Sequence, residues 1–273
     1  MMRKNIPFEQ YVLEPGLNQS KLGALRQCPA KFKYILDAEE KSSPAQDMGQ
    51  LFHSLVLEPD SFNDRYFCLP EIDRRTTKGK ELYAELTALH ADKIPVKPDD
   101  FNAAHEMAAA VRINTHANYL LQGAHTELTL DWVDEATGVA CKARVDAYNE
   151  ELGIVVDLKT TVDASPQGFP KKLLQYGYHR QAAWYLEALK RNGEAAEHFV
   201  FIAVEKTPPF LVGVYRISDD TIRLSKAENE KLLRIYAECK RTDTWPGYTQ
   251  GIEDISIPDY AINSMEETYG EPI

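Results

Sequence analysis

The chain has 273 residues, of which 44% are hydrophobic and 27% charged, and its formal net charge is −11. This length and apolar content are enough for one sizeable core, so we expect one elaborated domain. No apolar run approaches the ~18 residues of a membrane span, and the N-terminal residues lack the apolar core of a signal peptide, so we expect a cytoplasmic protein without a membrane partner. The negative charge argues against a protein that coats nucleic acid over its whole surface, although a local basic strip could still bind phosphates.

The first strongly patterned segment is Met48–Leu57, which is predicted to be an apolar helix. Gly49, Phe52, His53 and Val56 recur there at three- and four-residue spacing, which places them on one side of the helix. From the residues alone, His53 is either a hydrogen-bonded core residue or a ligand, and the core residue is the more common case.

The most basic short run of the chain comes next and contains Arg74, Arg75, Lys78 and Lys80. Such a run is usually only solvated, but in a flexible loop it is also a candidate for contact with phosphates. Arg26, on an earlier predicted helix, could also contact phosphate, although a solvated face is again the more common case.

Two segments further on, Val139–Tyr148 and Ile154–Thr160, are predicted to form a β-hairpin. Both are rich in β-branched and apolar residues, and the connection between them has turn chemistry. Because side chains alternate along a strand, Asp157 and Lys159 project from one face of the second strand. With Asp146 on the first strand, two carboxylates and one ammonium can converge.

Charges on a strand that is otherwise apolar need a partner. One interpretation is a divalent metal bound by Asp146, Asp157 and the backbone carbonyl of Leu158, with Lys159 facing an attacking water. The alternative is a salt bridge between Lys159 and one aspartate, which is the more common meaning of an isolated D-x-K.

The segment Leu173–Lys190 is predicted to be one crossover helix, and Tyr178, Gln181 and Tyr185 lie near one face of it. An aromatic stripe of this kind commonly packs a helix onto a sheet, but Gln181 is harder to explain as core. Further strands are predicted at His198–Glu205 and Leu211–Ile217, and a last helix at Asp219–Lys240.

These motifs together resemble a known family. Asp146 followed by Asp157-Leu158-Lys159 resembles the signature of PD-(D/E)XK nucleases, and Gln181–Tyr185 resembles the QxxxY motif of their RecB-like branch. Gly49–His53 with Val56–Pro59 is similar to the histidine-bearing helix of phage-type RecE exonucleases (exonuclease VIII). The resemblance covers nearly the whole chain.

The resemblance implies an α/β fold in which a central mixed β-sheet is flanked by helices, as in restriction endonucleases. The chain 1–273 would be a single nuclease domain. It would comprise a mainly helical N-terminal elaboration (1–123), a nuclease core (124–218) and a C-terminal helix and tail (219–273).

The resemblance also implies the site. His53, Asp146, Asp157 and the Leu158 carbonyl would bind Mg²⁺, for which Mn²⁺ would substitute. The catalytic residues would be Asp146, Asp157, Lys159, Glu127, Gln181 and Tyr185, and the DNA contacts Arg74, Arg75, Lys78, Lys80 and Tyr178. The four cysteines lack the clustered spacing of the iron–sulfur cluster that some RecB-like nucleases carry, so no such cluster is expected.

RecE-like enzymes degrade the 5′ strand of duplex DNA ends and expose 3′ tails for a single-strand annealing protein, and many such exonucleases are homo-oligomeric rings. The same activity, partner and assembly are therefore expected here. The motifs leave open a RecB-like nuclease of other polarity or a structure-specific endonuclease. A different class of protein, an inactive DNA-binding or scaffold protein with the nuclease fold, is also left open.

Overall fold

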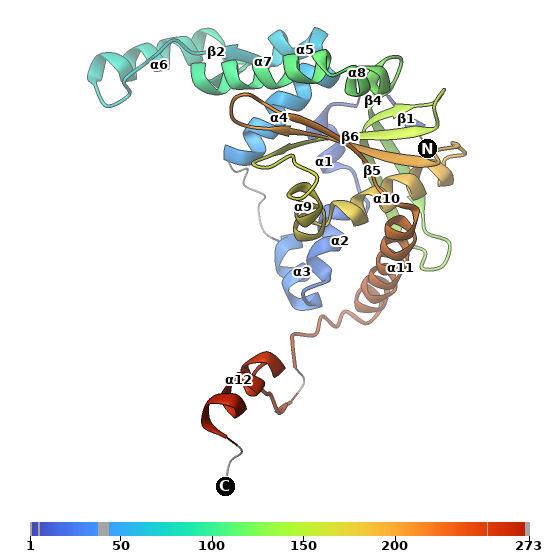
Figure 1. The fold of residues 1–273 in the computed structure, drawn as a ribbon. Coiled ribbons are helices and arrows are strands. Elements are labelled where there is room, and N and C mark those ends of the chain that lie inside the picture. The colour runs from blue at the N-terminus through green and yellow to red at the C-terminus, as the bar shows by residue number, and fades with distance from the viewer. Residues whose placement is uncertain (1, 5, 38–43, 250, 271–273) are drawn as a thin grey trace.

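A central β-sheet with helices on both faces organises the chain (Figure 1). The computed structural model describes residues 2–4, 6–37, 44–249 and 251–270. The sheet has six strands in the order β1-β4-β5-β6-β7-β8, of which only β6 and β7 pair in parallel. The expected mixed α/β architecture is therefore confirmed. The strands are β1 (Met2–Arg3), β4 (His125–Val133), β5 (Ala140–Asn149), β6 (Ile154–Thr161), β7 (His198–Glu205) and β8 (Val212–Arg216).

The predicted hairpin is present as β5 and β6. Backbone pairing between the two strands stops at Ala147 and Val156. One position further along, Asp146 Oδ2 accepts a hydrogen bond from the Leu158 amide at 2.9 Å, so a side chain takes the place of a backbone acceptor. The register therefore sets Asp146 opposite Asp157, where the two strands separate.

Two apolar clusters cover the two faces of the sheet. On one face, α4, α7 and α8 pack against side chains such as Val156 and Leu158 of β6. On the other face, α2, α3, α10 and α11 pack against side chains such as Val155 and Phe199. Because β6 is buried on both sides, its polar residues lie deep in the molecule. The helices named are α2 (Gln19–Leu25), α3 (Pro29–Asp37), α4 (Pro44–Leu57), α7 (Pro98–Ile113), α8 (Thr115–Leu121), α10 (Tyr178–Arg191) and α11 (Asp219–Thr242).

An arm extends from the sheet and contains a second, two-stranded parallel sheet (Figure 1). Neither of its strands was predicted from the sequence. The arm consists of α5 (Pro59–Arg65), β2 (Tyr66–Cys68), α6 (Thr77–Leu89), β3 (Ile94–Val96) and part of α7.

The prediction of one continuous helix over Leu173–Lys190 is wrong. Two helices, α9 (Phe169–Tyr176) and α10, meet at Gly177, whose φ of 71° lies in the left-handed region that favours glycine. A Cβ atom at position 177 would also overlap the Arg180 guanidinium. The break turns the start of α10 toward the end of β6.

The remaining two helices lie at the ends of the chain. The short α1 (Phe8–Leu13) follows β1, and α12 (Asp259–Tyr269) contains no buried residue and lies away from the sheet (Figure 1). In the described part of the chain, no helix is both long and apolar enough to cross a membrane.

Candidate active site

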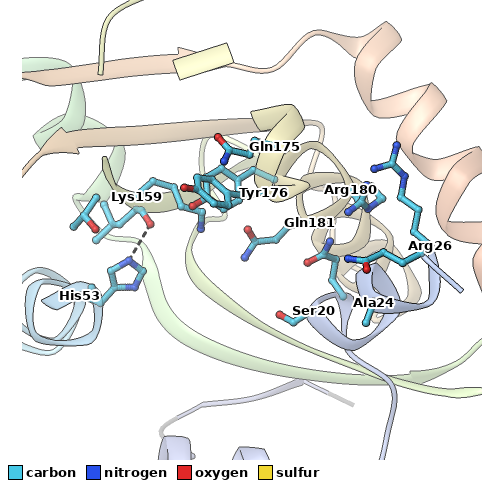
Figure 2. A pocket seen from close by; sticks show the side chains of 16 residues that line it. Ser20, Ala24, Arg26, His53, Lys159, Gln175, Tyr176, Arg180 and Gln181 are labelled. Atoms are coloured by element: carbon cyan, nitrogen blue, oxygen red, sulfur yellow. Dashed lines mark hydrogen bonds between the residues drawn. The ribbon is translucent and has the colours of Figure 1, made fainter. Parts of the chain in front are cut away.

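A cleft of about 820 Å³ opens at the end of β6. Its walls come from α2, α4, β6 and the junction of α9 with α10, so it joins segments that are far apart in the sequence (Figure 2). The lining residues include five of those expected in the site: His53, Leu158, Lys159, Tyr178 and Gln181.

Two carboxylates and one lysine lie behind this opening. Asp157 is fully buried and forms an ion pair with Lys159, while Asp146 holds the Leu158 amide. Burial and the nearby Asp146 raise the pKa of Asp157 to about 7, and burial also raises the pKa of Asp146. Burial opposes the charged form of Lys159, but Asp157 and Asp146 outweigh it and raise the pKa of the ammonium.

His53 reaches the same point from α4. Its Nε2–H donates to the Leu158 carbonyl oxygen at 2.9 Å (Figure 2), and its Nδ1 lies 3.5 Å from Asp146 Oδ2. Burial and the Lys159 charge lower the pKa of His53, which favours the neutral imidazole. The neutral form is the one that binds metals.

Glu127 faces this group from β4 in an unusual backbone conformation. Its neighbours Thr126 and Leu128 pair with Ala147 and Val145, so the register places Glu127 opposite Asp146. Its φ of 54° is left-handed, which is costly for a residue with a side chain. Glu127 also forms an ion pair with Arg144, and burial with the Asp146 charge raises its pKa.

The donor set and the charge balance of this group fit a divalent cation. Glu127 is balanced by Arg144, whereas Asp146 and Asp157 share the single charge of Lys159. Neither oxygen of Asp157 accepts a hydrogen bond of normal geometry from the described residues. One uncompensated negative charge with carboxylate, carbonyl and imidazole donors suits a hard metal such as magnesium or manganese.

The residues expected to bind the metal are bonded to one another or to Lys159 in this structure, and they are not arranged around a common metal position. The described residues contain no group of three or more His, Cys, Asp or Glu side chains positioned to hold a metal. The reason is that His53 bonds to the Leu158 carbonyl and Lys159 bonds to Asp157.

Helix α10 brings three further expected residues to this centre. The Tyr178 ring lies 4.7 Å from Lys159 Nζ, and Gln181 Nε2 donates to Tyr185 Oη at 2.8 Å. Burial and the Asp146 charge raise the pKa of Tyr185 well above its ordinary value, so its hydroxyl stays protonated. Gln181 and Tyr185 thus form one hydrogen-bonded unit beside the carboxylates.

The basic run is not brought to the cleft. Arg74 stacks on the Tyr83 ring at 3.9 Å, and Arg75 pairs with Asp73 at 2.9 Å. None of Arg74, Arg75, Lys78 and Lys80 lines the cleft, and α6, which contains both lysines, lies out on the arm (Figure 1).

One other cleft residue, Arg180, was not expected in the site from the sequence. Arg180 lines the cleft together with Arg26, and both pair with Glu228 of α11. A single arginine in a helix and a glutamate 48 residues later give no sequence signal that they meet. Of this group, only Arg26 had been considered as a phosphate contact.

Comparison with known proteins finds a family but no curated relative. The family described as "PDDEXK-like domain of unknown function (DUF3799)" matches residues 18–257. No curated protein matches the chain.

Several solved structures match the chain, among them the following two. One is a "Putative exonuclease" from Eubacterium rectale, with 15% identity and a TM-score of 0.57 over 98% of this chain and 100% of that one. The other is a phage related exonuclease from Haemophilus somnus 129PT, with 14% identity and a TM-score of 0.39 over 85% of this chain and 98% of that one. At 15% identity, the first structure shows a shared fold and nothing finer.

Proposed function

The chain belongs to the PDDEXK-like domain family, and from this premise we propose that the protein is a metal-dependent exonuclease that degrades the 5′ strand of duplex DNA ends. The exposed 3′ tails would serve recombination through a single-strand annealing protein. A ring of several copies, which would enclose the product strand, is part of the same proposal.

The single observation that carries the nuclease proposal is the convergence of Asp146, Asp157 and Lys159 with His53 at the base of one cleft. These residues come from three elements, α4, β5 and β6, and 106 positions separate His53 from Lys159. An ordinary structural salt bridge would need one aspartate, whereas here two buried aspartates share one lysine.

Each residue has a distinct part in the proposed reaction. A divalent metal bound by Asp146, Asp157, the Leu158 carbonyl and His53 would polarise the scissile phosphate and acidify the attacking water. Lys159 would orient that water and stabilise negative charge on the phosphate. Gln181, held by Tyr185, would fix the position of the phosphate against the carboxylates.

Duplex DNA labelled separately at each 5′ and each 3′ end tests the proposal. With Mg²⁺ we expect 5′ labels to be released first by the wild type. Lys159→Ala should show no digestion, because it removes the charge that acts in the transition state. EDTA should also stop the reaction.

Other results would change the assignment in defined ways. Release of 3′ labels first would point to opposite polarity, and cleavage of a circular duplex would point to an endonuclease. Binding without any digestion would favour an inactive DNA-binding or scaffold protein, and equal rates for wild type and Lys159→Ala would remove Lys159 from the reaction.

A further inference from the structure

Beside the end of the cleft that lies opposite His53 and Lys159, one carboxylate, Glu228 of α11, is surrounded by three nitrogen-bearing side chains. Glu228 Oε1 lies 3.0 Å from Arg26 Nε and 3.4 Å from Arg180 Nη1, and Glu228 Oε2 lies 3.7 Å from His179 Nε2. Figure 2 shows Arg26 and Arg180 on one side of the cleft and His53 and Lys159 on the other, with Gln181 between them.

Arg180 is the most unusual member of this cluster. It is only 6% exposed, yet its Nε has no hydrogen-bond partner in the described part of the chain. Its bond to Glu228 is long at 3.4 Å, so a guanidinium with five donors is served by one distant acceptor. Gly177 packs against this guanidinium, and a Cβ at Gly23 would lie 3.5 Å from it, so small residues leave it room.

The cluster is also short of negative charge. Two arginines share the single carboxylate of Glu228, whose side chain is 32% exposed and can be displaced toward solvent. A phosphate group offers more oxygens than a carboxylate, and arginine donors match its geometry in pairs. The buried, under-used donors of Arg180 are therefore better satisfied by a phosphate than by Glu228.

We propose that Arg26 and Arg180 form a second phosphate-binding subsite of the cleft, and that Glu228 occupies this subsite until a nucleic-acid strand displaces it. This inference rests on the proposed function, because it assumes that the strand lies along the cleft from Lys159 past Gln181. The ligand is either a terminal phosphate or a phosphodiester within the strand, since both present the same oxygens.

Glu228→Gln provides the sharpest test, because it removes the competing charge and keeps the shape. Fluorescence anisotropy with a short labelled duplex, in EDTA so that no cleavage occurs, should show binding about tenfold tighter than wild type, the scale of one charge-assisted hydrogen bond. Arg26→Ala should weaken binding and reduce the slope of log affinity against log salt by about one.

Glu187→Gln is a matched control. Glu187 is also bracketed by two cations between α10 and α11, with Arg191 Nε at 2.7 Å and Lys226 Nζ at 2.8 Å. Neither of these cations lines the cleft, whereas both arginines that pair with Glu228 do. Both glutamine variants change the net charge by the same amount. Only Glu228→Gln should tighten binding. Equal effects of the two variants, or weaker binding by Glu228→Gln with an unchanged melting temperature, would overturn the subsite.

The source of the phosphate is resolved by duplexes that carry a 5′-phosphate, a 5′-hydroxyl or a 3′-phosphate. A loss in Arg26→Ala confined to the 5′-phosphorylated or the 3′-phosphorylated duplex supports a subsite for that terminal phosphate, and an equal loss for all three supports an internal phosphodiester. Because the readout is binding without metal, tighter binding by Glu228→Gln in a protein that digests nothing would keep the subsite and reject the nuclease. Digestion by the wild type, together with unchanged binding by Glu228→Gln, would keep the nuclease and reject the subsite.

Discussion

Replacing Asp157 by asparagine should make the metal-free protein more stable while abolishing its proposed activity. Asp157 is fully buried and its pKa is raised to about 7, roughly three units above that of an unfolded aspartate. At 1.36 kcal/mol per unit, ionising it in the folded protein costs about 4 kcal/mol at pH 8. Asparagine keeps an oxygen for Lys159 and leaves that lysine balanced by Asp146.

The sign of the pH dependence follows from the raised pKa. The folded protein binds the Asp157 proton more tightly than the unfolded chain does, so this group stabilises the fold below about pH 4, and that contribution is lost as the pH rises through about 7. In EDTA at pH 8, Asp157→Asn should therefore melt higher than wild type, by about 2 °C for each kcal/mol gained. At pH 5 most of the difference should disappear.

Melting curves in EDTA from pH 5 to pH 9 measure this effect. Magnesium at one hundred times its dissociation constant should raise the free energy of unfolding of the wild type by about 2.7 kcal/mol, and with it the melting temperature. It should not raise the melting temperature of Asp157→Asn. Asp163→Asn is the control, because hydrogen bonds from Ser165 lower the pKa of Asp163, and its loss should bring no gain at pH 8. An Asp157→Asn protein that melts below wild type at pH 8 would refute the reasoning.

Two other substitutions separate metal binding from positioning. His53→Ala should raise the magnesium concentration needed for half-maximal activity by about 10- to 100-fold, with partial recovery in manganese; a core histidine would instead lower the melting temperature and leave the calorimetric metal titration unchanged. Gln181→Ala should lower the rate of digestion about tenfold, because it removes the side chain that Tyr185 holds against the phosphate. The loss should be smaller than in Asp157→Asn, because Gln181→Ala leaves every proposed metal ligand in place. A wild-type rate for Gln181→Ala would show that Gln181 has only a structural role.

The parts of the fold that the sequence predicts correctly depend on local pattern. The hairpin of β5 and β6 follows from two segments rich in β-branched and apolar residues on either side of a turn, in which Gly153 takes a φ of 63°. Asp146 and Asp157 are eleven residues apart on this hairpin, so their approach could be expected from the turn alone. The strands β7 and β8 are predicted for the same reason.

The parts that could not be predicted depend on contacts between distant segments or on backbone strain. His53 bonds to Leu158 across 105 residues, and the residues alone could not decide between a core position and a ligand position. The left-handed conformation of Glu127 has no signature in an alternating strand. Gly177 could have indicated the helix break, but the apolar period continues across it and favoured a single helix.

The placement of β6 at the centre of the sheet has a consequence for the motions of the molecule. Its residues pair with β7 along the whole strand, the Leu158 amide donates to Asp146, and both faces of the strand are covered by the apolar clusters. We therefore expect hydrogen exchange at Val156 and Leu158 to require opening of the whole domain, and exchange in α12, which buries no residue, to proceed through local opening. The carboxylate centre should thus belong to the slowest-exchanging part of the described chain. If a nucleic-acid strand binds as proposed, we expect the backbone to move in the walls of the cleft, where α9 and α10 meet at Gly177, and not in β6.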